Sequence, residues 1–269
     1  MKLFHELGFM LLPGVFSPEE IDAVLWEAKE VFHRQFLNHG YTTSASARTI
    51  DEQVFNDCLY RLFEEDLPCL MNCGKQIQHL ISLHRLSLDE RLIRILKEAN
   101  LRFPNICTRP VLTFHHPKLA SEPIYFKVDA HQDWRSMQGS VNSVVIWMPL
   151  APLSTEIGPL HVLPGSHLRG LLSDRMEKGF GMVTLRPEEE AGMIPLIPTL
   201  GDVVIFSSLL VHKSGENKAA APRWSCHFRY NDLDEKTFIE RGYCHPYLYK
   251  PVDELLTPNF LPRLHPESE

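Results

Sequence analysis

Two histidines and an aspartate in this sequence could hold a metal ion. His131 and Asp133 stand two positions apart at the end of a run with strand character, and residues i and i+2 of a strand point to the same side. His212 comes after another strand-like run, at 203–207. Two imidazoles and one carboxylate form the set that holds an iron ion and leaves one side of it open. The first pair alone is a weak signal, because a similar pair also occurs at His265-Pro266-Glu267.

An arginine further along the chain adds a second kind of chemistry. Arg223 follows His212 by eleven positions. Its planar guanidinium can grip a carboxylate through two parallel hydrogen bonds, which is the contact that a dicarboxylic cosubstrate requires. The two histidines, the aspartate and the arginine together are much more specific than any pair of them, and they indicate a metal-dependent enzyme that uses such a cosubstrate.

The first hundred residues show mainly helical patterns. A helix is predicted to begin with a capping box, in which Ser17 is the N-cap, Pro18 takes the first helical position and Glu20 closes the box. A second capping box is expected at Ser87 and Glu90, ahead of another amphipathic run. We expect these helices to be packing elements without chemistry of their own.

From residue 110 onward the chain changes to short runs rich in Val, Ile, Phe and Trp, separated by Pro, Gly, Asn and Ser. This pattern is typical of a double-sheet jelly roll or a related sandwich. No linker rich in Gly, Ser or Pro divides these runs from the helices, so we expect one α+β domain, mainly β, with the helices on one face of a sheet. Strands are predicted at 9–12, 110–116, 124–131, 143–150, 160–163, 203–207 and 224–230.

The segment 171–198 interrupts the series of predicted strands. It contains glycines, a charged run and several prolines. Inserts of this length are commonly binding loops or lids. We therefore expect this segment to become ordered over a bound substrate.

The chain resembles the phytanoyl-CoA dioxygenase family from about residue 7 to residue 230. The resemblance implies a double-stranded β-helix, which is a cupin-like jelly roll, with N-terminal helices packed on one sheet. We expect a single oxygenase domain built from helical support at 1–105, a jelly-roll core at 106–232 and a C-terminal extension at 233–269. The family's marks appear in this order: Gly8-Phe9, Ser17-Pro18-Glu19-Glu20-Ile21, His131-Gln132-Asp133, Gly158-Pro159-Leu160, Leu163-Pro164-Gly165-Ser166-His167, His212-Lys213-Ser214 and Arg223.

The resemblance also implies the cofactors and the residues that bind them. It implies Fe(II), 2-oxoglutarate and O2, with His131, Asp133 and His212 as metal ligands. Arg223 would grip the distal carboxylate of 2-oxoglutarate. Since halogenating relatives replace the carboxylate ligand with a small residue, the aspartate argues against halogenation. Further contacts to the cosubstrate are implied at Ser214, Gln132, Trp147 and, by a looser match, Lys75.

The residues around the first two ligands are candidates for contact with the prime substrate. Three of them follow the ligands directly, where a loop would lie at the mouth of the site: Trp134, Arg135 and Gln138. Tyr125 and Lys127 alternate with the first histidine, so they share its side of the predicted strand. These side chains suggest a polar substrate.

The composition is that of a globular protein and argues against nucleic-acid-binding and membrane-spanning classes. The chain has 269 residues, of which 44% are hydrophobic and 23% charged, enough for one substantial core. A net charge of -7 argues against a nucleic-acid partner. Neither a signal peptide nor an apolar run long enough to span a membrane is visible, so we predict a cytoplasmic protein.

The six cysteines are scattered, and we interpret them as free thiols in a reducing compartment. Cys69 and Cys73 lie four positions apart, with His79 and His84 after them, which suggests a zinc site. The same spacing suits one face of a helix, and this second interpretation is the one we favour.

Two other functions stay open at this point. The chain could be a non-catalytic or sensing relative on the same fold, or another cupin-type metalloenzyme such as an isomerase or a zinc hydrolase. The intact set of two histidines and one aspartate argues against the first, and an arginine aimed at a dicarboxylate argues against the second. We therefore favour a dioxygenase that hydroxylates a small-molecule metabolite and releases succinate and CO2. The substrate, the choice between hydroxylation, desaturation and cyclisation, and the oligomeric state do not follow from the sequence.

Overall fold

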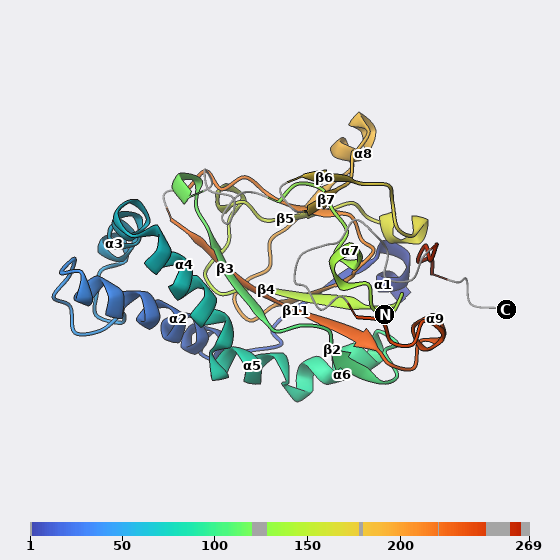
Figure 1. Cartoon of the computed structure of the whole chain (residues 1–269), viewed down its shortest axis with the longest axis horizontal. Helices are drawn as coiled ribbons and strands as arrows, with labels where there is room; N and C mark the ends of the chain where they lie inside the picture. The colour runs from blue at the N-terminus through green and yellow to red at the C-terminus, as the bar shows by residue number, and fades with distance from the viewer. Residues whose placement is uncertain (1, 120–127, 178–179, 220, 246–258, 265–269) are drawn as a thin grey trace.

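Two antiparallel sheets face each other, and a layer of helices covers the outer side of the larger one (Figure 1). The computed structural model describes residues 2–119, 128–177, 180–219, 221–245 and 259–264. The apolar side chains between the sheets form one core cluster, and those between the larger sheet and the helices form another. The expected α+β organisation, with helices on one face of a sheet, is confirmed.

The larger sheet is organised around its longest strand, β11. Strand β4 pairs along one edge of β11, while β3 and β2 share the other edge, one beside each half of the strand. The order is β1, β9, β4, β11 and β2, with β3 beside β11. The strands are β1 (Phe9–Leu12), β2 (Pro104–Ile106), β3 (Val111–His115), β4 (Val144–Pro149), β9 (Val203–Ser207) and β11 (Arg223–Asp232).

The smaller sheet consists of short strands. Strand β5 (Leu160–Val162) lies between β10 (His212–Ser214) and β8 (Ile194–Leu196), and β6 (Arg175–Glu177) pairs with β7 (Phe180–Met182). His131 links the two groups of strands, because its backbone bridges both Met182 and His212. This residue therefore occupies a strand position inside the sheet.

The predicted strands agree with the structure where the residues are described. The runs at 9–12, 110–116, 143–150, 160–163, 203–207 and 224–230 all contain strands, while most of the run at 124–131 lies outside the described residues. The expectation for 171–198 needs a correction. This segment does not merely interrupt the strand series, because it supplies β6, β7, the helix α8 (Pro187–Ala191) and β8.

Alternation along the strands separates the two cores. In β4, Val144, Ile146 and Met148 face the helices, whereas Val145 and Trp147 face the smaller sheet. In β11, the side chains of 224, 226, 228 and 230 are sealed under the helices. The intervening residues of β11 therefore point toward the smaller sheet, and several of them are polar.

The helical layer begins as the sequence predicts. The helix α2 (Pro18–Asn38) starts with a complete capping box, in which Ser17 Oγ accepts from the Glu20 N–H and the Glu20 carboxylate accepts from the Ser17 N–H. The other helices are α1 (Lys2–Leu7), α3 (Glu52–Glu65), α4 (Leu67–Gln76), α5 (Ile81–Ser87), α6 (Glu90–Glu98), α7 (Trp134–Met137) and α9 (Lys236–Glu240), with 3-10 turns η1 (Ile77–His79), η2 (Pro117–Leu119), η3 (Thr155–Ile157) and η4 (Ser166–Arg169).

The second predicted capping box is wrong. Asp89, rather than Ser87, caps α6, and its carboxylate accepts from the Arg91 N–H at 2.9 Å. The Ser87 hydroxyl instead donates to the carbonyl of His84, at the end of α5. A carboxylate directly before the first helical residue satisfies the exposed N–H groups there, so the serine is left to end the preceding helix.

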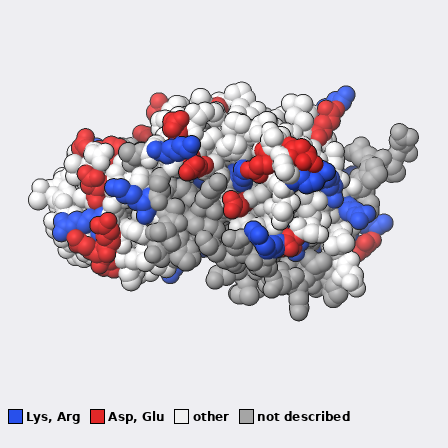
Figure 2. Space-filling model, turned by 90° about the horizontal axis from the view of Figure 1, so that it is seen from above, with Lys and Arg blue, Asp and Glu red and all other residues white. Residues whose placement is uncertain are grey.

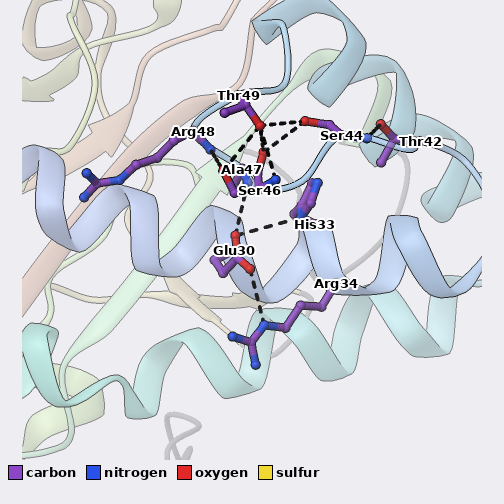
Figure 3. A network of polar contacts seen from close by, with 9 residues as sticks. All are labelled: Glu30, His33, Arg34, Thr42, Ser44, Ser46, Ala47, Arg48 and Thr49. Carbon is purple, nitrogen blue, oxygen red and sulfur yellow. Dashed lines mark hydrogen bonds and ion pairs between the residues drawn. The ribbon is translucent and has the colours of Figure 1, made fainter.

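The connection between α2 and α3 is held to α2 by polar contacts (Figure 3). The Glu30 carboxylate accepts from the Ala47 N–H at 3.1 Å and lies 3.8 Å from His33 Nδ1. Within the loop, the Thr49 hydroxyl donates to the Ser46 carbonyl. The loop is therefore anchored to the helix through one carboxylate.

The surface carries both signs of charge. On the face shown in Figure 2, Lys and Arg side chains are interspersed with Asp and Glu across the described surface, and the described part of that face shows no continuous basic patch. Among the described helices, none combines the length and the apolar character that crossing a bilayer requires.

Phe32 is a suitable residue for testing how the helices and the large sheet depend on each other. It is fully buried and packs edge-on against Phe114 of β3 and Trp224 of β11. We expect Phe32→Ala to lower the free energy of unfolding by about 3–5 kcal/mol, because the cavity opens where two layers meet. The exposed Leu37 on the same helix is the control, and Leu37→Ala should change the free energy of unfolding by less than about 0.5 kcal/mol. Equal effects in urea unfolding would contradict this packing.

Candidate metal centre

The two histidines and the aspartate predicted as ligands come together between the sheets. His131 and His212 exchange backbone hydrogen bonds of 3.0 and 3.1 Å, and their ring centroids lie 4.2 Å apart. Asp133 Oδ1 is 3.7 Å from His131 Nε2. One ligand atom from each of the three residues lies within 4.8 Å of the other two. The arrangement can hold one ion from three sides.

Both imidazoles are fixed in the orientation that a metal ligand needs. His131 Nδ1 lies 2.8 Å from the Asp129 carbonyl, and His212 Nδ1 lies 3.0 Å from the Leu210 carbonyl. A carbonyl can only accept, so each Nδ1 carries the proton and each Nε2 keeps its lone pair for an ion. Burial, together with the neighbouring His131, lowers the pKa of His212 to about 4, which keeps this imidazole neutral near pH 7.

An arginine of β11 keeps the aspartate ionised. Arg229 donates from Nη2 to Asp133 Oδ1 at 3.0 Å and from Nε to Oδ2 at 3.3 Å. Burial raises the pKa of Asp133, but the Arg229 guanidinium beside it outweighs burial and holds that pKa well below the ordinary value. Two neutral imidazoles and one carboxylate are donors that suit a divalent ion such as Fe(II).

Arg223 is buried at the start of β11 without a carboxylate partner among the described residues. Its Nη1 donates to the Gly158 carbonyl, its Nη2 lies 3.5 Å from Ser214 Oγ, and its Nε has no hydrogen-bond partner in the described part of the chain. Burial lowers the pKa of Arg223 to about 10, so the side chain stays charged at neutral pH. A buried cation with an unused donor fits the carboxylate of a ligand.

The chain also matches proteins that are already known. A family model described as phytanoyl-CoA dioxygenase (PhyH) matches residues 4–225. The chain belongs to the phytanoyl-CoA dioxygenase family. It is therefore a 2-oxoglutarate-dependent dioxygenase, with Fe(II) and 2-oxoglutarate as cofactors.

Two curated relatives of the family cover most of the chain. The peroxisomal phytanoyl-CoA dioxygenase of Homo sapiens is 29% identical over 252 residues, which is 86% of this chain and 68% of that protein. The 1-deoxypentalenic acid 11-β-hydroxylase of Streptomyces exfoliatus is 32% identical over 230 residues, or 74% of this chain and 78% of that protein.

Solved structures resemble the chain at the level of the fold. The non-haem α-ketoglutarate-dependent epimerase SnoN of nogalamycin biosynthesis has a TM-score of 0.53 at 18% identity, over 86% of this chain and 80% of that one. EctD from S. alaskensis, solved with 2-oxoglutarate and 5-hydroxyectoine, has a TM-score of 0.51 at 18% identity, over 87% and 75% of the two chains. The chain therefore has a cupin-like fold.

Two of the residues that the resemblance implies as cosubstrate contacts lie on the same side of the large sheet as Arg223. Ser214 is within 3.5 Å of the guanidinium. Trp147 faces the smaller sheet from β4, and its backbone lies opposite His227 of β11. His227 Nε2 has no hydrogen-bond partner among the described residues, and burial holds the pKa of this histidine well below its ordinary value.

Two other implied contacts lie elsewhere. The Gln132 amide donates to the carbonyls of Gly170 and Leu209, at 2.9 and 2.6 Å, and accepts from the Leu172 N–H at 2.8 Å. Its side chain therefore fixes backbone behind the ligands rather than facing the cosubstrate. Lys75 is exposed on α4, in the layer that covers the opposite face of the large sheet.

The predicted substrate residues have structural roles where they are described. Trp134 is a core residue whose indole N–H donates to the Ser140 carbonyl, and Gln138 is buried at the end of α7. The turn after Asp133 directs both side chains into the protein, and their contact with a substrate stays a prediction. Arg135 pairs with Asp174 at 2.8 Å, which ties α7 to the strand β6 region. Tyr125 and Lys127 lie outside the described residues.

His227 was not predicted as a residue of this centre, and Arg229, considered only as a possible pocket residue, was not predicted to bind Asp133. The signal was present, because both lie at even spacing from Arg223 on a strand and so share its face. What the sequence could not show is that the same face reaches the carboxylate of Asp133, since that contact joins residues 96 positions apart.

Replacing Gln132 with leucine tests whether this side chain holds backbone in place or contacts the cosubstrate. We expect Gln132→Leu to lower the free energy of unfolding by about 1–3 kcal/mol, because it leaves buried backbone groups of Gly170, Leu172 and Leu209 without partners. Urea unfolding of the protein without cofactors measures this. Gln53→Leu, at an exposed glutamine of α3, is the control. Unchanged stability combined with lost 2-oxoglutarate affinity would instead make Gln132 a cosubstrate contact.

Proposed function

We propose that this dioxygenase hydroxylates a C–H bond of a small-molecule metabolite at an iron held by His131, Asp133 and His212. One observation carries the proposal: three donors converge with both imidazoles already oriented. They lie on the same side of the large sheet as a buried arginine that has no acidic partner among the described residues. We further propose that the two facing sheets are the walls of a double-stranded β-helix, as the cupin-like fold suggests.

Each residue of the centre has a task that follows from its contacts. Arg223 and Ser214 hold the distal carboxylate of 2-oxoglutarate, and Trp147 supplies an apolar wall beside it. Arg229 keeps Asp133 charged and fixes its rotation. When bound, the iron and the electrons of 2-oxoglutarate would activate O2 as the oxidant, a chemistry that the side chains themselves lack. The protein contributes position, exclusion of water and a fixed protonation state for each ligand.

The substrate class rests on the relatives and on the surface. The relatives include a phytanoyl-CoA dioxygenase, a hydroxylase of 1-deoxypentalenic acid and, over 42% of this chain at 30% identity, a methylphosphonate hydroxylase of Gimesia maris. A coenzyme-A carrier brings several phosphate charges, which favour a basic surface. The described part of the face in Figure 2 has mixed charge instead, so we propose a small metabolite rather than an acyl-CoA thioester.

Anaerobic titration with Fe(II) and 2-oxoglutarate tests the assignment of the centre. The chelate of the two has a weak visible charge-transfer band, which we expect in the wild type and not in Asp133→Ala. We expect Arg223→Leu to bind 2-oxoglutarate about 100-fold more weakly at unchanged Fe(II) affinity, because losing a buried charge pair costs about 2–5 kcal/mol.

Arg102→Leu is the matched control for the loss of a guanidinium. Arg102 is exposed and pairs only loosely, at 3.5 Å, with the exposed Asp234, so this variant should behave as the wild type. A wild-type protein that is folded and binds iron, yet shows no band with 2-oxoglutarate, would overturn the assignment and favour another cupin-type metalloenzyme.

A further inference from the structure

A second group of metal-binding side chains lies in the helical layer, remote in sequence from the proposed iron ligands. His39 follows the last residue of α2, Asp66 stands between α3 and α4, and Cys69 lies in the first turn of α4. One ligand atom from each of the three lies within 4.8 Å of the other two. We propose that His39, Asp66 and Cys69 form a second metal site, for a divalent cation of the zinc class, that joins three helices.

The orientation of His39 supports a cation at this place. Its Nδ1 lies 2.8 Å from the Gln35 carbonyl, so Nδ1 carries the proton and donates it. The Nε2 atom then faces Asp66 Oδ2 at 3.2 Å. In a neutral ring, Nε2 and the carboxylate would present lone pairs to each other, which is unfavourable unless a cation lies between them. A proton or a metal ion can fill that place.

The same arrangement occurs at the proposed iron centre. There too, each histidine donates from Nδ1 to a main-chain carbonyl and turns Nε2 toward the carboxylate side of the cluster. Metal-binding histidines generally have such a partner on the second nitrogen. His39 is therefore oriented as a ligand would be before any ion arrives.

The cysteine decides which cation fits. An imidazole, a carboxylate and a thiolate are a donor set for zinc and similar borderline ions, whereas magnesium and calcium take oxygen ligands. Cys73, one helical turn further along α4, lies close enough for its thiol to hydrogen-bond with that of Cys69. Metal binding would form a metal–sulfur bond at Cys69 and release the thiol proton to water.

The site is accessible from solvent. The side chains of His39 and Asp66 are 23% and 38% exposed to solvent, and Cys69 is half-buried. Three protein ligands leave a fourth position for water. A bound ion would connect the end of α2 to the junction of α3 and α4. It would therefore stabilise the helical layer that covers the large sheet.

Cobalt(II) titration tests the site, because a cobalt–thiolate bond gives a near-ultraviolet charge-transfer band. The proposed iron ligands include no sulfur, so the band reports only the second site, and Asp133→Ala removes the competing centre. We expect the band in that background, and we expect Cys69→Ser to abolish it. Asp66→Asn should raise the cobalt dissociation constant by more than about 100-fold, while an asparagine can still cap α4.

Cys244→Ser is the matched control, since Cys244 is half-buried like Cys69 but lies far from it in sequence. It should leave the band unchanged. A protein that binds cobalt without any thiolate band, or whose band survives Cys69→Ser, would overturn the proposal. The cation between His39 and Asp66 would then be a proton, and the Asp66 carboxylate would only cap α4.

Discussion

The buried ion pair between Asp133 and Arg229 is the contact on which the candidate centre depends. A carboxylate that is 4% exposed would lose its charge, and with it its value as a ligand, unless a cation lay beside it. Arg229 supplies that cation from β11, on the opposite sheet from the bridge at His131. The pair thus ties the two sheets together and sets the rotation of the carboxylate. The ligand geometry is therefore present before any ion binds.

Strand β11 connects this pair to the rest of the fold. One face of the strand is apolar and buried under the helices, and this burial fixes its register against β4 and β3. A slip by one residue would turn Arg223, His227 and Arg229 outward together. The helical layer contributes to the chemistry indirectly, because by sealing the apolar face it directs these three side chains toward the smaller sheet.

The parts of this structure that local patterns encode could be predicted from sequence. The capping box at Ser17 and the apolar run at β9 are each determined by neighbours a few positions away, and both were found. Strands β6, β7, β8 and β10 have only three residues each and include charged residues, glycine or proline, so they carry no periodic signal. Their pairing comes from the sheet around them. The same holds for the His39 cluster, in which the histidine lies 27 positions before the aspartate, and for the Ser87 position, where two plausible caps compete.

Gln132 illustrates what a motif alone leaves undecided. In His131-Gln132-Asp133 the outer residues share one face, so the middle residue must point away from the ion. The structure shows what it does there: it binds backbone of 170–172 and of Leu209, and this fixes the short stretch that carries both ligands. Leu210, the residue after Leu209, accepts a hydrogen bond from His212 Nδ1 through its carbonyl. The same loop therefore orients the third proposed ligand. Gln132 thereby connects the segments that carry the three proposed ligands, and only the fold reveals this.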